Sequence, residues 1–251
     1  MSEQLTAAER TFLHDLEFEF ERNGDALSGS LTITPEMLTP GSDQALLSVI
    51  ATVADVFTGI PISHDGKVAL TVDLVTRLLR PIGVGTYSIE SDVIKEGRSL
   101  IVTEAVVRDG SDHVAHCLAT FVPFPVPGLA SSDPTGIQGR IPIGGGGLSS
   151  PYADALGVRR LAAGVAEVDR TAYTLQPAGT IQGGTIAALI EAAATDRLGG
   201  PLRDLDVRFL ATVKAGPARA TAVALDERTA RVTVVDAGND DRLTAIAVAS
   251  R

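Results

Sequence analysis

The sequence predicts an α+β protein made of two similar units, each an antiparallel sheet wrapped around one central helix. Two observations support this prediction. The order strand, apolar helix, four strands occurs twice along the 251 residues, and a segment rich in proline and glycine separates the two occurrences. We therefore expect a first unit over residues 1–124, a linker over 125–154 and a second unit over 155–251, paired as a pseudo-dimer within one chain.

The first unit alternates apolar and polar residues over 26–34, which is typical of a strand. The segment 43–57 (DQALLSVIATVADVF) is apolar at most positions, and a helix that is apolar nearly all round must be buried. Four extended segments follow, at 68–79, 85–94, 100–108 and 113–122.

The second unit repeats this order. Residues 164–175 resemble a strand, and the alanine-rich segment 184–197 (GTIAALIEAAATDR) favours a helix. Strands are expected at 205–213, 218–225, 230–236 and 243–249. The match extends to details, since Val106-Val107 before Gly110 parallels Val234-Val235 before Gly238.

The segment between the units contains several prolines and the glycine run from Gly144 to Gly147. Prolines and glycines at this density disfavour both helices and paired strands, so the segment is predicted to be a linker. A phosphate-binding loop is not expected, because no Gly-Lys-Ser/Thr follows the glycines.

The composition narrows the classes of partner. A formal net charge of −10 argues against nucleic acid, which requires a concentrated positive surface. The single cysteine, Cys117, excludes an internal disulfide and fits a cytoplasmic protein. The N-terminus has no apolar signal sequence, and no segment reaches the length of about 20 apolar residues that a membrane span needs. No metal or cofactor is expected.

The start of the second apolar helix is a candidate site. Gly183 and Gly184 open it, and their backbone N–H groups lie at the positive end of the helix dipole without partners within the helix. These groups could hold a thioester oxygen as negative charge develops on it. Glu191 lies about two turns further along a helix nearly free of charge, where a carboxylate is costly unless it is hydrated, paired or used. Thr195 follows one turn later.

This stretch resembles the hotdog acyl-CoA thioesterases of the PaaI type, in which Gln-Pro-x-Gly-x-x-His-Gly-Gly opens the central helix and an acidic residue follows. The resemblance implies that Gly183 supplies an oxyanion N–H, Gly184 contacts substrate, Gln176 orients the thioester or water, and Thr195 orients the carboxylate. Gln182 replaces the usual histidine, so a proton-transfer role at that position is in doubt. The matching residues are Gln176, Pro177, Gly179, Gln182, Gly183, Gly184, Glu191 and Thr195.

Two alignments of the first helix are possible. One places Gly41-Ser42 on the double glycine and leaves Val49 at the carboxylate position. The preferred one places Leu47 and Ser48 there and sets Asp55 opposite Glu191, as in the Ala-x-x-Ala-Asp ending of PaaI-type helices. Because hotdog sites lie across the interface of two units, Asp55 would complete a site with Gln176, Gln182 and Gly183. Glu191 would lie in a degenerate site beside Ser48.

The resemblance implies hydrolysis of an acyl-CoA thioester, with the carboxylate acting as general base or as nucleophile. Arg77 and Arg208 are candidates for binding the phosphates of CoA, and a homodimer of double hotdogs is possible. Two alternatives remain open. The helix carboxylates could pair with Arg77 or Arg208 in a structural role, or the protein could bind acyl-CoA without hydrolysing it.

Overall fold

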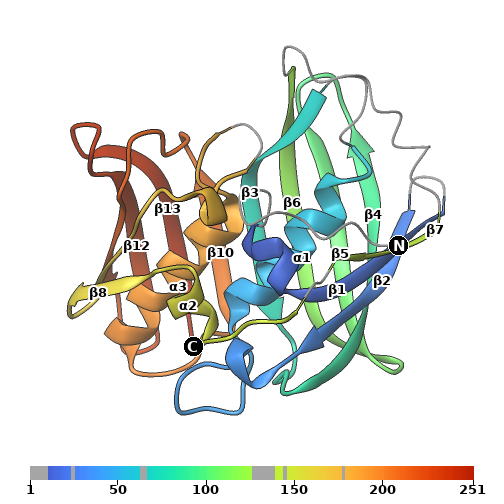
Figure 1. Cartoon of the computed structure of the whole chain (residues 1–251), viewed down its shortest axis with the longest axis horizontal. Helices are drawn as coiled ribbons and strands as arrows, with labels where there is room; N and C mark the ends of the chain where they lie inside the picture. The colour runs from blue at the N-terminus through green and yellow to red at the C-terminus, as the bar shows by residue number, and fades with distance from the viewer. Residues whose placement is uncertain (1–10, 24–25, 63–66, 126–138, 144–145, 177–178) are drawn as a thin grey trace.

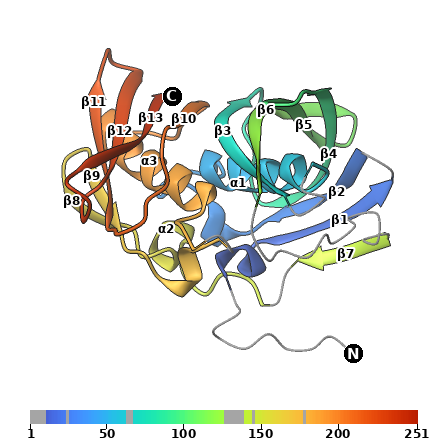
Figure 2. The same cartoon turned by 90° about the horizontal axis from the view of Figure 1, so that it is seen from above.

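The computed structural model describes residues 11–23, 26–62, 67–125, 139–143, 146–176 and 179–251. Their strands form one 13-stranded sheet in the order β7-β1-β2-β4-β5-β6-β3-β10-β13-β12-β11-β9-β8. The sheet curls around the two main helices, which Figure 2 shows most plainly for α1, with strands above and below it. No helix in the described part of the chain is long and apolar enough to span a bilayer.

The first half, coloured blue to green in Figure 1, contains β1 (Glu17–Asn23), β2 (Ala26–Ile33), α1 (Leu47–Gly59), β3 (Lys67–Leu78), β4 (Gly85–Glu96), β5 (Ile101–Asp109) and β6 (Asp112–Pro125). The second contains α2 (Tyr152–Ala155), β8 (Arg159–Ala162), β9 (Val165–Val168), α3 (Gly183–Leu198), β10 (Asp204–Phe209), β11 (Ala218–Ala224), β12 (Thr229–Asp236) and β13 (Arg242–Ser250). Between them in sequence, β7 (Gly139–Ile143) joins the first half by pairing with β1. Short 3-10 turns occur at Phe12–Asp15, Pro35–Met37 and Ala172–Thr174.

The two halves meet along β3 and β10, which pair antiparallel with Leu74 opposite Val207. The sheet is therefore continuous across the pseudo-dimer, and α1 packs directly against α3 on its inner side (Figure 1). This arrangement confirms the predicted α+β fold, in which two units each wrap a sheet around one central helix.

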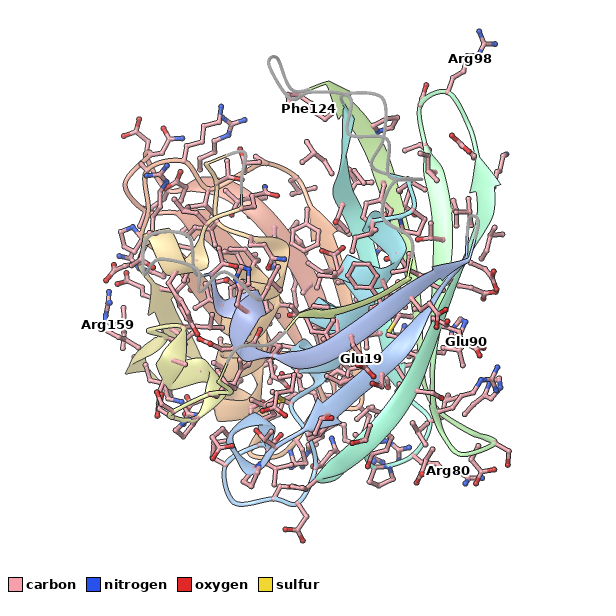
Figure 3. All side chains as sticks on the ribbon, turned by 45° about the vertical axis from the view of Figure 1, so that its right-hand side comes forward. Glu19, Arg80, Glu90, Arg98, Phe124 and Arg159 are labelled. Atoms are coloured by element: carbon pink, nitrogen blue, oxygen red, sulfur yellow. The ribbon has the colours of Figure 1, made fainter. Side chains whose placement is uncertain are left out.

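Apolar residues explain why both helices lie inside. In α1, Leu47, Ile50, Val53 and Phe57 are fully buried, and they pack in the same core as inward-facing residues of the strands. Figure 3 shows Glu90 of β4 projecting outward, away from this core, with Arg80 and Arg98 in the loops at the ends of the strands.

The structure corrects several predicted boundaries. Helix α1 begins at Leu47 rather than Asp43, and the strand expected over 164–175 is limited to Val165–Val168. The expectation that the linker sustains no strand is wrong, because β7 lies within it and pairs with β1. The other parts of the linker at 126–138 and 144–145 lie outside the described residues.

Candidate active site

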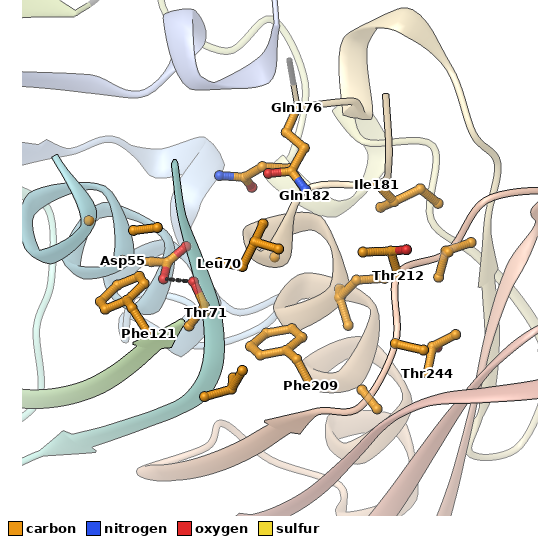
Figure 4. A pocket seen from close by; sticks show the side chains of 18 of the residues that line it. Asp55, Leu70, Thr71, Phe121, Gln176, Ile181, Gln182, Phe209, Thr212 and Thr244 are labelled. Carbon is orange, nitrogen blue, oxygen red and sulfur yellow. Dashed lines mark hydrogen bonds between the residues drawn. The ribbon is translucent and has the colours of Figure 1, made fainter. Parts of the chain in front are cut away.

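A cavity of about 620 Å³ lies between the two halves, beside the ends of both helices. Helix α1 contributes Asp55 to its lining, α3 contributes Gly183, and β3 contributes Thr71. Figure 4 shows Phe121 and Phe209 among the apolar side chains that surround these polar groups. The cavity therefore brings a carboxylate from one half to a helix N-terminus from the other.

Asp55 is the acidic group of this cavity. Its Oδ1 accepts a hydrogen bond of 2.7 Å from the hydroxyl of Thr71, drawn as a dashed line in Figure 4. Burial raises the pKa of Asp55 to about 6, although the bond from Thr71 opposes the change. A carboxyl with such a pKa is ionised at neutral pH and basic enough to accept a proton from water.

Gly183 is the first residue of α3 and faces Asp55 across the interface. A methyl group built on Gly183 would lie 3.6 Å from Asp55 Oδ2 and 3.6 Å from the ring of Phe209. Within the described residues its N–H makes no hydrogen bond, as expected for the first turn of a helix. The positive end of the helix dipole makes this N–H a suitable donor to a developing oxyanion.

Two glutamine side chains line the cavity beside Gly183 (Figure 4). Gln182 caps α3, since its Oε1 accepts a hydrogen bond of 2.8 Å from the N–H of Gly184. This bond assigns the remaining NH2 group of Gln182 as a donor. Gln176 donates from Nε2 to the hydroxyl of Thr180 at 2.5 Å, which leaves its Oε1 as an acceptor. Pro177, the next residue of the motif, lies outside the described residues.

Gly184 has a packing role instead of the expected contact with substrate. It is buried, and a methyl group built on it would lie 2.3 Å from Oγ1 of Thr52 on α1. Such a distance is impossible for real atoms, so glycine is what allows α1 and α3 to approach closely here. The double glycine thus combines one residue at the cavity with one at the helix contact.

Glu191 occupies the pseudo-equivalent position on α3, and the structure places it against the start of α1. Its Oε1 accepts a hydrogen bond of 2.8 Å from the N–H of Leu47, and its Oε2 accepts one of 2.7 Å from that of Ser48. The side chain is only 1% exposed. Burial raises the pKa of Glu191, and the bonds from Ser48 and Leu47 oppose this change. The carboxylate therefore occupies the N-terminus of α1 and satisfies two backbone N–H groups there.

Three predicted site residues have other environments. Ser48 is buried, with its N–H bound to Glu191, and does not line the cavity. The expectation that Thr195 orients the Glu191 carboxylate is wrong, because the Thr195 hydroxyl has no hydrogen-bond partner among the described residues. Instead, the hydroxyl of Thr71 on β3 donates a hydrogen bond to the carboxylate of Asp55 and orients it. The sequence of helix α1 does not indicate this partner, because Thr71 lies on a different element.

The two arginines expected to bind phosphates are paired with aspartates where β3 and β10 meet. Arg77 lies 3.3 Å from Asp204 and 3.0 Å from Asp206, and Arg208 lies 3.0 Å from Asp73. Neither arginine lines the cavity, so the structure gives no support for the expected phosphate contacts. These pairs also exclude the alternative in which Arg77 or Arg208 neutralises a helix carboxylate. No group of three His, Cys, Asp or Glu side chains in the described residues is arranged as a metal site.

Solved structures share this architecture along nearly the whole chain. The 12:0-ACP thioesterase from Umbellularia californica is 10% identical, with a TM-score of 0.62 over 92% of this chain and 98% of that one. An acyl-ACP thioesterase from Bacteroides thetaiotaomicron is 12% identical, with a TM-score of 0.61 over 90% and 97%. The chain has the double-hotdog fold.

A further hotdog protein, of unknown function and from Alicyclobacillus acidocaldarius, is 14% identical, with a TM-score of 0.55 over 92% of this chain and 93% of that one. No protein-family model matches the chain, and no curated protein matches it either. At these identities the likeness establishes the double hotdog as the fold, and the chemistry has to be argued from the cavity.

Proposed function

We propose that the protein hydrolyses an acyl-CoA thioester in the cavity between its two hotdog units, by a mechanism similar to that of PaaI-type thioesterases. The observation that supports this most strongly is the meeting of Asp55 Oδ2 with the N-terminus of α3 at Gly183. A base and an oxyanion donor on opposite sides of one apolar cavity are the two groups that thioester hydrolysis needs.

In the proposed reaction the thioester oxygen accepts a hydrogen bond from the N–H of Gly183, assisted by the NH2 of Gln182. Ionised Asp55 takes a proton from water as the water oxygen attacks the carbonyl carbon. The carbon–sulfur bond then breaks, and the thiolate of CoA leaves and takes up a proton. Direct attack by the Asp55 carboxylate, followed by hydrolysis of the anhydride, uses the same groups.

Replacing the base tests the proposal. Asp55→Asn keeps an acceptor for Thr71 but cannot take a proton, so the rate of CoA release should fall by about 10³-fold. Asp73→Asn is the matched control, because Asp73 pairs with Arg208 away from the cavity, and it should retain activity. The substrates are acyl-CoAs with short, long and aromatic acyl groups, together with the same acyl groups on pantetheine.

The outcomes separate the candidate functions. Full activity of Asp55→Asn would remove Asp55 from the mechanism. Calorimetric binding of the acyl-CoAs without turnover by the unaltered chain would instead identify a non-catalytic acyl-CoA-binding protein.

A further inference from the structure

One wall of the cavity is a loop without regular secondary structure. Residues 210–216, here the 210–216 loop, connect β10 to β11, and Leu210, Ala211, Thr212 and Val213 all line the cavity. Figure 4 shows Thr212 beside Thr244 on the side of the cavity away from Asp55. The position of this loop therefore sets the shape of the space available to a bound molecule.

The loop is held at its beginning by the neighbouring strand. The N–H groups of Leu210 and Ala211 both donate to the carbonyl oxygen of Thr244 on β13, at 2.8 and 3.1 Å. The corresponding loop of the first half begins in the same way, since the N–H groups of Leu79 and Arg80 both donate to the carbonyl oxygen of Val114. This anchor belongs to the repeated fold and not to the site.

The far end of the 210–216 loop is held by a buried carboxylate. Asp236, the last residue of β12, is fully buried. Its Oδ2 accepts hydrogen bonds from the N–H groups of Lys214 and Ala215 at 2.9 and 3.1 Å, and its Oδ1 accepts one from Gly216 at 2.7 Å. Burial opposes the ionised form, but the backbone N–H groups outweigh it and hold the pKa of Asp236 below its usual value.

In the first half a neutral side chain holds the backbone of the equivalent loop, and the one carboxylate paired with that loop in the described residues, Asp112, contacts the exposed side chain of Arg80 instead of backbone N–H groups. There the hydroxyl of Tyr87 both accepts from the N–H of Gly83 and donates to its carbonyl oxygen, at 3.2 and 3.1 Å. A neutral group is thus sufficient for the fold at this position. The contact of the Asp236 carboxylate with the 210–216 loop, here called the Asp236 clamp, occurs in the half whose loop lines the cavity. The loop at residues 79–84 does not line the cavity.

We propose that Asp236 is a positioning residue that fixes the 210–216 loop and thereby determines which acyl groups the cavity accepts. This inference rests on the proposed function, because it concerns the substrate selectivity of the same site. Asp236 does not touch the reacting atoms. Its effect is expected in KM and in the preference among acyl groups, not in the chemical step.

Asp236→Asn replaces one of the two accepting oxygens with an NH2 group that faces backbone N–H donors. For the best acyl-CoA we expect KM to rise about 10-fold and kcat to change less than about threefold, with a flatter preference among acyl groups. Asp226→Asn is the matched control, since Asp226 holds the N–H groups of Arg228 and Thr229 in the exposed turn between β11 and β12. The control should leave KM and the preference unchanged.

An unchanged KM and an unchanged preference among acyl groups in folded Asp236→Asn would overturn the proposal. So would an equal rise of KM in Asp226→Asn, or a loss of kcat in Asp236→Asn with KM unchanged. If Asp236→Asn does not fold, hydrogen exchange on the unaltered chain provides the test. The amides of Lys214, Ala215 and Gly216 should exchange about 100-fold more slowly than amides of exposed turns, and free exchange would overturn the proposal.

A second readout separates this proposal from the proposed function. Non-hydrolysable S-alkyl-CoA thioethers of different lengths can be titrated by calorimetry whether or not the chain hydrolyses thioesters. If no acyl-CoA is hydrolysed but thioether affinities depend on chain length, the proposed function fails while the clamp can still be tested. Asp236→Asn should then weaken that dependence, and an unchanged dependence would overturn the clamp alone.

Discussion

Asp55 and Glu191 occupy the same position in their helices, eight residues beyond Leu47 and Gly183 respectively. The longer glutamate side chain reaches the backbone N–H groups at the start of the opposite helix, and both of its oxygens are bound there. Asp55 is shorter by one methylene group and leaves the N–H of Gly183 without a partner in the described chain. The shorter acid and the cap that Gln182 already gives to Gly184 therefore both distinguish the start of α3 from the start of α1.

The pH dependence of activity follows from Asp55. Its carboxyl has a pKa of about 6 and must be ionised to accept a proton. We expect kcat/KM to rise tenfold per pH unit below about pH 6 and to level off above it. A profile measured between about pH 4.5 and 8.5 on a single acyl-CoA tests this. A midpoint near 4, the ordinary range of a carboxyl, would show that burial does not tune this group.

The same shift in pKa predicts a gain of stability on removing the charge. Unfolded Asp55 releases its proton near the ordinary carboxyl pKa of 3.8, whereas in the folded protein the pKa of Asp55 is about 6. Between these values the folded state binds more protons, so the contribution of Asp55 to stability falls as pH rises through this window. Asp55→Asn should therefore be more stable than the unaltered chain at neutral pH, by about 1–3 kcal/mol. Urea unfolding at pH 4 and pH 8 measures this, and a difference that is equal at both values would contradict it.

The two central helices are placed by contacts that run from one to the other. At the start of α3, Gly184 admits the side chain of Thr52, and at the start of α1, Glu191 supplies the caps that the local sequence lacks. Leu46, the N-cap residue of α1, has no side-chain hydrogen bond to the helix. The first turn of α1 therefore depends on α3, whereas α3 is capped by its own Gln182 and meets α1 at Gly184 through packing.

Alanine at the two glycines should separate their roles. In Gly184→Ala the added methyl meets Thr52 at an impossible distance, so the helices must move apart, at a cost of about 2–3 kcal/mol. In Gly183→Ala the methyl meets Asp55 and Phe209 at ordinary contact distance, so the protein should fold normally. Its activity should fall, because the methyl lies between Asp55 and the N-terminus of α3, where the thioester is proposed to bind. Thermal unfolding and CoA release on both variants test this pair. Equal stability of the two variants would contradict the assignment.

Glu191→Gln should affect stability much more than catalysis. Glutamine keeps one accepting oxygen but turns an NH2 group toward a backbone N–H, which costs about 1–3 kcal/mol in a buried site. We expect a lower urea midpoint and, under conditions where the variant is folded, a kcat within about threefold of the unaltered chain. A loss of kcat as large as that of Asp55→Asn would instead place a second active site at Glu191.

At the scale of the whole molecule, hydrophobic periodicity predicted the central helix of each half and the four strands after it, but it did not predict β1 or β8. It could not predict the start of α1 at Leu47, because the group that caps it, Glu191, is remote in sequence. Strand β1 was not predicted, although its sequence alternates Glu-Phe-Glu-Phe-Glu and Phe18 and Phe20 are buried. This alternation is typical of a strand with one buried face and would have been sufficient to predict it.

Strand β7 escaped prediction for a different reason. It contains Pro142, which argues against a strand in local sequence. Because β7 is the outermost strand on its side of the sheet, it pairs only with β1, and proline is tolerated at such an edge. Position in the sheet is decided by the whole fold, and no local pattern encodes it.

Thr71 illustrates the same limit within the site. Its hydroxyl reaches Asp55 because β3 crosses the end of α1, a contact set by the packing of helix on sheet. That Asp55 and Gly183 line one cavity follows the alignment preferred from the resemblance to PaaI-type helices, since the repeated order of elements alone left two alignments open. Ser48 and Gly184 lie at the contact between α1 and α3 and not in the cavity, and the closeness of the two helices is not visible in either sequence segment.

The asymmetry between the two helix contacts predicts one site per chain. Glu191 is buried with both oxygens bound, and Tyr152, from α2, is also fully buried next to Thr52 in the same region, its hydroxyl 3.2 Å from Oγ1. The cavity at Asp55 instead has room for a ligand, at about 620 Å³. Calorimetric titration with an S-alkyl-CoA thioether should give one molecule bound per chain, whereas a symmetric double hotdog with two open sites would bind two. Gly183→Ala places a methyl group between Asp55 and the start of α3 and should weaken this binding, whereas unchanged binding by that variant would place the ligand away from Gly183.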